Sequence, residues 1–534
     1  MKTRIYIGKW LELKPYHRQA STDMYYLRLC NEVKEVLIQV EYFILQKYLD
    51  KEALDLLSCF LVSYFEDIIS ETHIWSAFVK KHTALYGKEL PFYPAGEYYE
   101  GEINEQDIAF LVWYFLNTIR EEKFISPYNE FIEDIASDVM DIFDEEYEYA
   151  PENETLKAYY RVVPAETDFY IVRNCIDNIL FKSYLFCTDT RFRLLESEEE
   201  LLEGEFNIHN ENMLLYLNEN RDSFLHSRCT RLLSMKGKEW AAEVLGKSHP
   251  LYADLYNMSQ KILGFFLYKG QNDTHITLEH IASEKKFLLT KKSFDHHNQL
   301  KKVDTIVFMG LVQWREEWWF SGIYTQQEFN RELVQEEKKS TKSKAAVAFL
   351  DHAQNAPEFL QKQEKAFLEF NNNAPIAFLP AEKIESFLND YLAYYNASLN
   401  LSAEEREAST KRAKEKGYSL EEEEENKDLL DTEEPGLVFF NPESGCEIAV
   451  GINSAFPAKE NPYYQEDESE DAVFRLFMSE DFSKELAMYC IDNYKDELPF
   501  FKEETGRKYL EDMDFLLRFW KKENYHAVPS VTYF

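Results

Sequence analysis

The strongest constraint on the fold of this chain is a change in the spacing of its apolar residues near Gly264. Before that point the spacing is helical: in residues 24–50, apolar side chains recur at i, i+3, i+4 and i+7, as on one face of an amphipathic helix. Ser21, Thr22 and Asp23 offer N-caps ahead of this stretch. We therefore predict one mostly helical domain over residues 1–260. Its further predicted helices lie at 51–70, 106–120, 130–143, 155–162, 165–186 and 210–233.

After Gly264 the apolar residues follow a strand pattern. Five short runs are rich in β-branched and aromatic residues: FFLYKG, THITLEHI, KKFLLT, DTIVFMGLVQW and EEWWFSGIY. Turn signals at 270–273 and 295–298 separate some of them. Five strands over roughly sixty residues fit a small antiparallel barrel of SH3-like or OB-like size. We predict this barrel over residues 261–335.

The segment VQWREEWWFSGIY, residues 312–324, holds three tryptophans and two further aromatic residues. Alternate residues of a strand face opposite ways, so Trp318 and Phe320 share one face, and Trp319 and Ser321 share the other. The cluster is either a surface that holds a ligand or a strand with one aromatic face filling the barrel. Dense aromatic clusters are more often buried, so we favour the core role.

The rest of the chain divides into three predicted parts. Helical spacing at 344–370 and 382–399 predicts a helical connector over residues 336–400. A charged stretch without an apolar stripe, which includes five consecutive glutamates, predicts a flexible linker over residues 401–435. A hairpin, GLVFF and CEIAVGINSAF around NPESG, opens a predicted α+β domain over residues 436–534, with helices at 479–493 and 503–522. The predicted fold class is therefore mainly α with β.

The charge of the chain limits its partners. It has 97 acidic and 59 basic residues and a formal net charge of −38, which repels phosphate backbones and favours solubility. No apolar window reaches the length of a membrane span, and the N-terminal MKTRIYIGKWLELKPY lacks the apolar core of a signal peptide. Seven cysteines without a C-x-x-C pair fit reduced thiols. We expect a cytoplasmic protein without a membrane partner, and the charge disfavours nucleic acid as a partner of the whole molecule.

The motifs of several large enzyme classes are absent. The chain has no G-x-x-x-x-G-K-[ST], no G-x-G-x-x-G after a predicted strand, no G-x-S-x-G and no H-E-x-x-H. These absences weigh against the major nucleotide-hydrolysing, dinucleotide-binding and serine-hydrolase classes. We predict no cofactor and favour a protein without catalytic activity.

Four histidines of the predicted barrel form the polar group with the clearest metal-binding chemistry: His275, His280, His296 and His297. Sets of histidines and carboxylates bind zinc and other divalent metals, and neighbouring barrel loops would have to bring these side chains together. Such a site would indicate a metal-dependent hydrolase or nuclease. The spacing fits no named metal motif, however, and a polar strand face followed by a surface turn explains the same residues.

The predicted barrel is also locally basic, with eight lysines and five acidic residues between Lys261 and Asp304. A basic, aromatic surface is how OB-type modules hold single strands, which would indicate a nucleic-acid-associated module. Lysines that merely solvate loops explain the same surplus, and acidic protein segments would satisfy the same surface. The ligand-binding candidates of this barrel are Lys285, Lys286, Lys291, Lys292, Trp314, Trp318 and Trp319.

Several motifs carry a family resemblance: W-x-x-x-x-P-Y at residues 10–16, STDMYYL, LGKSHPLYADLYNM, GFFLYKG, LTKKSFD, GLVQWREEWWFSG and GLVFFNPESGCEIA. Together they resemble a family of uncharacterised bacterial proteins, defined as a domain of unknown function, over nearly the whole chain. The resemblance implies a bacterial, cytoplasmic protein. It brings no activity, cofactor or catalytic residue.

These observations together favour a non-enzymatic interaction or scaffold protein with protein partners. The sequence does not select an oligomeric state. If the C-terminal hairpin forms a cleft with the helical region, Asn441, Glu443 and Asn453 become further candidates for a binding site.

Overall fold

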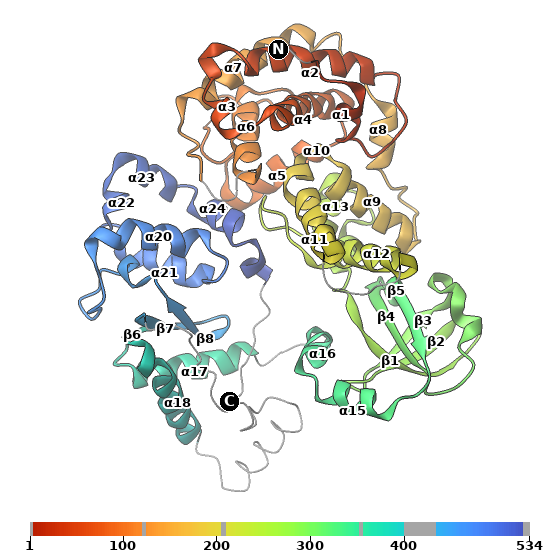
Figure 1. Ribbon diagram of the computed structural model, residues 1–534, viewed down its shortest axis with the longest axis vertical. Helices are drawn as coiled ribbons and strands as arrows, with labels where there is room; N and C mark the ends of the chain where they lie inside the picture. The colour runs from red at the N-terminus through yellow and green to blue at the C-terminus, as the bar shows by residue number, and fades with distance from the viewer. Residues whose placement is uncertain are drawn as a thin grey trace. The chain divides into compact units, whose positions relative to one another are not determined.

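The computed structural model describes residues 4–94, 96–119, 124–203, 210–351, 356–399 and 434–526. The chain divides into two compact units. The first consists of Met1–Lys261 with Leu311–Ile323, and the second of Ile262–Gly310 with Tyr324–Phe534. The predicted fold class is confirmed, since a large helical N-terminal region is followed by a small barrel and an α+β part (Figure 1).

The first unit is helical apart from its strand residues 311–323. Two of its helices, at 51–70 and 105–119, are buried along most of their length, because apolar residues occur on every side of them. Its helices are α1 (Ile7–Leu11), α2 (Asp23–Leu37), α3 (Leu45–Tyr48), α4 (Lys51–Ser70), α5 (Ile74–Tyr86), α6 (Glu105–Ile119), α7 (Glu130–Glu146), α8 (Glu154–Tyr159), α9 (Phe169–Lys182), α10 (Tyr184–Phe186), α11 (Phe192–Glu203), α12 (Asn210–Ser227), α13 (Gly237–Leu245) and α14 (Tyr252–Asn257).

The predicted long helix over 24–50 is broken in the structure. Helix α2 ends at Leu37, a 3₁₀ turn covers Val40–Tyr42, and the short α3 follows. Tyr42 turns inward and donates a hydrogen bond to Asp138 of α7 at 2.7 Å, while Val40 and Phe43 face solvent. This contact between distant residues outweighs the local helical spacing. The spacing of apolar residues within 24–50 could not have predicted it.

Two other predicted helices are shorter than their apolar pattern. The predicted helix 165–186 begins only at Phe169, where the Asp168 carboxylate caps the backbone N–H of Tyr170 at 2.7 Å. The predicted helix 210–233 ends at Ser227, before a turn in which Leu233 and Ser234 have positive φ angles. A capping residue sets the start of the first helix and a turn sets the end of the second, although apolar residues extend beyond both limits.

All five predicted barrel strands are present: β1 (Ile262–Gln271), β2 (His275–His280), β3 (Lys286–Thr290), β4 (Ile306–Trp314) and β5 (Glu317–Gln327). They close in the order β1-β2-β3-β5-β4. The β1–β2 and β2–β3 pairs are antiparallel. A closed ring with an odd number of strands cannot alternate in direction throughout. The barrel is therefore mixed, and not wholly antiparallel as predicted.

The aromatic segment 312–324 is a buried seam, as favoured from the sequence. Trp314 and Trp319 are 1% and 4% exposed, whereas Trp318 is half-buried. The Trp319 ring lies 5.9 Å from Phe169 and 6.0 Å from Tyr170, both of α9. The buried face of β5 thus packs against a helix, where we had expected an aromatic face to fill the barrel.

A second sheet contains β6 (Ile376–Leu379), β7 (Gly436–Asn441) and β8 (Gly445–Val450), in the order β6-β7-β8. The hairpin β7–β8 was predicted. Strand β6 corrects the prediction of a purely helical connector over 336–400, because it pairs with β7 and lies within the same sheet. The apolar run of this strand was too short to be recognised in the sequence, since only four residues, IAFL, form it.

The remaining helices of the second unit surround this sheet or follow the barrel. Phe367 and Tyr391 pack with Val438 and Phe440 in one apolar cluster. The predicted linker 401–435 lies outside the described residues, except for its last two. The helices are α15 (Arg331–Lys339), α16 (Thr341–Ala345), α17 (Ala356–Phe370), α18 (Ala381–Ser398), α20 (Ser469–Met478), α21 (Lys484–Tyr494), α22 (Pro499–Lys502), α23 (Glu504–Leu510) and α24 (Met513–Trp520).

Candidate functional site

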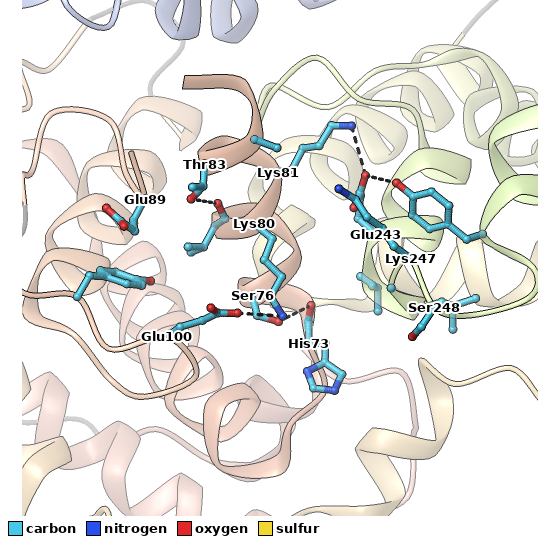
Figure 2. A pocket seen from close by; sticks show the side chains of 17 residues that line it. His73, Ser76, Lys80, Lys81, Thr83, Glu89, Glu100, Glu243, Lys247 and Ser248 are labelled. Atoms are coloured by element: carbon cyan, nitrogen blue, oxygen red, sulfur yellow. Dashed lines mark hydrogen bonds and ion pairs between the residues drawn. The ribbon is translucent and has the colours of Figure 1, made fainter. Parts of the chain in front are cut away.

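A cavity of about 790 Å³ opens in the helical unit between α5, the residues Glu89, Tyr98 and Glu100, and the turn from α13 to α14 (Figure 2). Its lining is rich in charged and hydroxyl side chains and includes few large apolar ones. The lining residues are His73, Ser76, Val79, Lys80, Lys81, Thr83, Ala84, Glu89, Tyr98, Glu100, Glu243, Val244, Leu245, Gly246, Lys247, Ser248 and Tyr252.

Helix α5 forms one wall because a buried carboxylate fixes where the helix begins. Asp67 of α4 accepts the backbone N–H groups of Ile74 at 3.3 Å and Trp75 at 2.7 Å, so it caps the first turn of α5. From this start, Ser76, Lys80 and Thr83 repeat at helical spacing and lie on the face that lines the cavity.

The opposite wall is the turn after α13. Gly246 ends the helix with φ +85°, a conformation that favours glycine, and its N–H bonds the carbonyl of Ala242 at 2.9 Å. His249 then ties the turn down, since Nε2 lies 3.0 Å from the carbonyl of Val162 and Nδ1 accepts the N–H of Leu251. Lys247 and Ser248 are thereby held at the cavity.

Several charges of the cavity are already satisfied by the protein. Lys80 pairs with Glu100 at 3.2 Å near the solvent. Oε1 of the buried Glu243 accepts from Lys81 at 3.3 Å, from the hydroxyl of Tyr252 at 3.0 Å and from that of Tyr256 at 2.6 Å. These bonds hold α5 against α13 and α14 and give the cavity a fixed shape.

Two charges of the lining remain uncommitted. Neither the Lys247 ammonium nor the Glu89 carboxylate has an ion-pair or side-chain hydrogen-bond partner in the described part of the chain. Figure 2 shows them on opposite sides of the view, with Lys80 between them. The cavity thus offers one free charge of each sign at separate places.

On one side of the cavity, the lining residue Tyr98 is hydrogen-bonded to the buried Asp107. Tyr98 donates to Asp107 at 2.9 Å, and Asp107 also accepts from Tyr64 at 2.7 Å and from Asn104 at 3.3 Å. Burial raises the pKa of Asp107 to about 7, although these donors oppose the shift. Burial likewise raises the pKa of the Tyr98 hydroxyl above its usual value.

The hydroxyls of the α5 wall serve the helix itself. Ser76 donates to the carbonyl of His73 at 3.4 Å, and Thr83 donates to that of Val79 at 2.8 Å. Burial lowers the pKa of His73, which favours its neutral form. Among the lining residues, no hydroxyl is hydrogen-bonded to a histidine ring, which is the pairing that activates a serine or threonine nucleophile.

A second polar group, in the interior of the same unit, resembles a catalytic triad in composition only. Ser321, Asp222 and His226 lie together, but Ser321 donates to both oxygens of Asp222 at 2.8 Å. The serine and the aspartate both face Nε2 of His226, at 3.3 Å and 3.9 Å, whereas a triad places them on different ring nitrogens. All three side chains are buried.

This interior group attaches strand β5 to helix α12 and has a structural role. Lys261 pairs with Glu219 at 2.5 Å and with Asp222 at 2.6 Å. The second oxygen of Glu219 accepts the backbone N–H of Ile323 at 2.7 Å. Gly322, at φ +87°, makes this approach feasible, because a Cβ there would lie 2.0 Å from Glu219. The arrangement fastens the strand to α12.

The predicted histidines do not converge. His280 is buried and its Nδ1 lies 2.9 Å from Ser283, while Nδ1 of His275 lies 2.8 Å from Thr274. Nδ1 of His297 lies 3.0 Å from the carbonyl of Phe294, and His296 stacks on Tyr324. Within the described ranges, no three His, Cys, Asp or Glu side chains form a group that could hold a metal ion.

Two tryptophans of the predicted ligand surface of the barrel are buried. Trp314 donates to the carbonyl of Thr167 at 3.2 Å, and both Trp314 and Trp319 are too buried to stack on a ligand. Lys286 and Lys292 are exposed, and Lys285 and Lys291 are half-buried.

The three candidates of the C-terminal part lie in the second unit. Asn441 donates to Glu485 at 3.1 Å and accepts the N–H of Glu443 at 2.8 Å. Asn453 lines a separate hollow of about 510 Å³ and donates to the carbonyl of Pro435 at 2.7 Å.

The residues of the α5 cavity were not predicted as a site. One part of the signal was visible, since Leu245–Tyr252 falls within LGKSHPLYADLYNM, one of the motifs that carried the family resemblance. Nothing in the sequence linked this motif to Glu89 or Lys80, which lie 156 to 172 residues earlier.

Comparison with known proteins places the cavity in a recognised family region. A family model described as "Protein of unknown function (DUF3843)" matches residues 4–286, which include every residue of the cavity lining. No curated protein and no solved structure matches the chain. Among the helices that the structure describes, none combines the length and apolar character needed to cross a membrane.

Proposed function

This chain belongs to the protein family of unknown function DUF3843, and we propose that it is a non-enzymatic interaction protein that holds a short peptide segment of a protein partner. The segment enters the cavity beside α5 and carries both a basic and an acidic group. The observation that carries the proposal is the pair of uncommitted charges, Lys247 and Glu89, in one cavity.

The charge balance of the cavity supports a ligand with both signs. Lys80, Lys81 and Lys247 match Glu89, Glu100 and Glu243 in number, so the lining is nearly neutral within a chain of net charge −38. A phosphate-rich ligand would meet three carboxylates, and an apolar ligand would leave the two uncommitted charges, Lys247 and Glu89, without water. A zwitterionic ligand satisfies both free charges.

The volume supports a peptide. Ligand cavities span roughly 300–1,000 Å³, and this cavity, at about 790 Å³, exceeds what one amino acid would fill. An extended segment of a few residues reaches from Glu89 to Lys247 and presents its backbone to Ser76 and Ser248 on the way. The bonds of Glu243 hold the walls in place, and a preformed wall lowers the entropy lost on binding.

The test compares three synthetic peptides of equal length, with lysine and glutamate at opposite ends, with lysine at both ends, or with glutamate at both ends. Isothermal titration calorimetry on the full chain measures their dissociation constants. We expect the mixed peptide to bind more tightly than the other two. Losing one charge-assisted contact weakens binding by about tenfold, so Lys247→Glu and Glu89→Lys each produce a loss of that order.

The double variant Lys247→Glu with Glu89→Lys gives the sharpest result, because the same peptide can bind it in the reverse direction. Binding should then recover. Lys51→Glu changes a lysine that is also exposed but does not line the cavity, and it serves as the control. Equal affinity for all three peptides, or full binding by Lys247→Glu, would refute the proposal.

A further inference from the structure

The turn after α13 presents a group of hydrogen-bond donors to the α5 cavity. Lys247 and Ser248 are both exposed and line the cavity on the opposite side of the view from Glu89 (Figure 2). In the part of the chain that the structure describes, neither their backbone N–H groups nor their side chains bond to another protein group. These two adjacent residues thus offer two N–H groups, a hydroxyl and an ammonium group to a ligand.

The turn is held in place on both sides of these two residues. The N–H of His249 donates to the carbonyl of Gly246 at 2.9 Å, and the N–H of Gly246 donates to that of Ala242 at 2.9 Å. Nε2 of His249 also lies 3.0 Å from the carbonyl oxygen of Val162. The donors are therefore positioned before a ligand binds, which lowers the entropy lost on binding.

The number of these donors suits a carboxylate. An ionised carboxylate has two oxygens with about four sites that accept hydrogen bonds. The backbone N–H groups of Lys247 and Ser248, the serine hydroxyl and the lysine ammonium supply about that number. Because the carboxylate is charged, each of these bonds is stronger than a bond between neutral groups.

The surrounding charges favour this singly charged anion over a phosphate. Helix α13 ends immediately before the turn, so the partial negative charge of its last carbonyl groups lies beside the donors. The uncommitted Glu89 carboxylate lines the same cavity. Both features oppose the charge of about −1.5 to −2 that a phosphate monoester carries at pH 7. A carboxylate carries one negative charge, which the Lys247 ammonium balances.

These donors suit a carboxylate at the end of a partner chain better than one on a side chain. The terminal carboxylate is attached directly to the backbone, whereas a glutamate carboxylate loses the freedom of about three rotatable bonds on binding. Val244 and Leu245 line the cavity beside the turn and can contact an aliphatic last side chain. Capture of a C-terminal carboxylate by backbone N–H groups is a recurring mode of peptide recognition.

On the basis of the function proposed above, we infer that the cavity binds the free C-terminus of a partner protein. Lys247 and Ser248 hold the terminal carboxylate. The bound chain extends from there towards Glu89, which receives a basic side chain a few residues before the end. The bound peptide therefore has one direction, and its terminal carboxylate is the main recognised group.

Isothermal titration calorimetry with the full chain compares four short peptides, each with an acetylated N-terminus and one lysine. The first, acetyl-Lys-Ala-Ala-Ala, ends in a free carboxylate, and the second is the same peptide with a C-terminal amide. The third, acetyl-Lys-Ala-Glu-Ala amide, carries its only carboxylate on a side chain, and the fourth has phosphoserine in place of that glutamate. We expect the first peptide to bind about tenfold more tightly than each of the others.

The double variant Lys247→Gln with Ser248→Ala tests where the carboxylate binds. It removes two donors from an exposed turn, and a thermal melt checks that the protein is folded. The preference for the first peptide over its amide should fall from about tenfold to about twofold or less, because only the free carboxylate uses these donors. Lys51→Gln changes an exposed lysine that does not line the cavity and should keep the preference.

The possible results separate this inference from the function on which it rests. If the glutamate peptide binds as tightly as the first, the chain end is not recognised, although a segment of mixed charge still is. Tightest binding by the phosphoserine peptide would assign the turn to a phosphate. A double variant that keeps the tenfold preference would exclude Lys247 and Ser248 as the carboxylate site. Equal binding of the free and amidated peptides, or no binding of any peptide, would overturn both proposals.

Discussion

Lys261, which neutralises the two α12 carboxylates that hold β5, offers the most direct test of how the helical unit is stabilised. The side chain of Lys261 is 5% exposed, and its ammonium group pairs with Glu219 and Asp222 at 2.5 and 2.6 Å. Lys261→Met removes the positive charge and keeps most of the side-chain volume. Asp222 retains its pair with Arg173, at 2.5 Å, so the loss falls mainly on Glu219.

The expected effect is large because the carboxylates are buried. Breaking a buried ion pair by removing one partner destabilises a protein by about 3–5 kcal/mol. The remaining Arg173 contact places Lys261→Met near the lower end, at about 3 kcal/mol. Lys269→Met is the matched control: Lys269 forms two ion pairs near the surface, at 3.0 and 3.2 Å, and its loss should change the free energy of unfolding by about 1 kcal/mol or less.

Urea unfolding followed by tryptophan fluorescence measures these free energies. A second change, Glu219→Gln, identifies the cause, because glutamine still accepts the N–H of Ile323 but carries no charge. Adding it to Lys261→Met should therefore restore more than half of the lost stability. A loss under about 1 kcal/mol for Lys261→Met, or a double variant no more stable than the single one, would refute this account of how β5 is held.

Three further predictions concern the cavity support, the aromatic seam and a packed glycine. The pKa of Asp107 is about 7 in the folded chain and 3.8 for a free side chain, so between these pH values the folded state holds a proton that the unfolded state has released. Stability should fall as pH rises through this window, by roughly 4 kcal/mol in total at ~1.4 kcal/mol per unit, and Asp107→Asn should flatten the dependence of melting temperature on pH. Trp319→Ala should lower the free energy of unfolding by about 3–5 kcal/mol and Trp318→Ala by clearly less, since only Trp319 is fully buried; equal losses in urea unfolding would contradict the assignment of the buried face. Gly506→Ala should destabilise the second unit, because its Cβ would lie 1.9 Å from the carbonyl oxygen of Phe500, whereas Gly8→Ala has open space and should be tolerated in a thermal melt.

The sequence suggested candidate residues that are neighbours in the chain, whereas the structure joins residues that are far apart in it. We predicted candidate sites from the barrel histidines and lysines because these residues are close together in the chain. The structure does not bring the histidines together and instead joins Lys81 to Glu243, and Glu219 to Lys261 and Ile323. Proximity in sequence was therefore a poor guide to a site whose walls come from three separate segments.

Local chemistry determined much of the fold. Helix α4 spans the predicted residues 51–70, since Asp50 caps its first turn and its apolar residues continue without interruption to Ser70. The five barrel strands occur where alternating runs and turn residues place them. Both signals act between residues a few positions apart, so the sequence alone contains them.

Only the tertiary structure determined which distant segments of the chain contact one another. The break after Leu37, the pairing of β6 with β7, the packing of Trp319 on α9 and the cavity beside α5 all depend on contacts between residues far apart in the chain. In a chain with 156 charged residues, many pairings of opposite charge are conceivable. The folded backbone selects those few that become buried, because only there is an unpaired charge too unfavourable to be left without its partner.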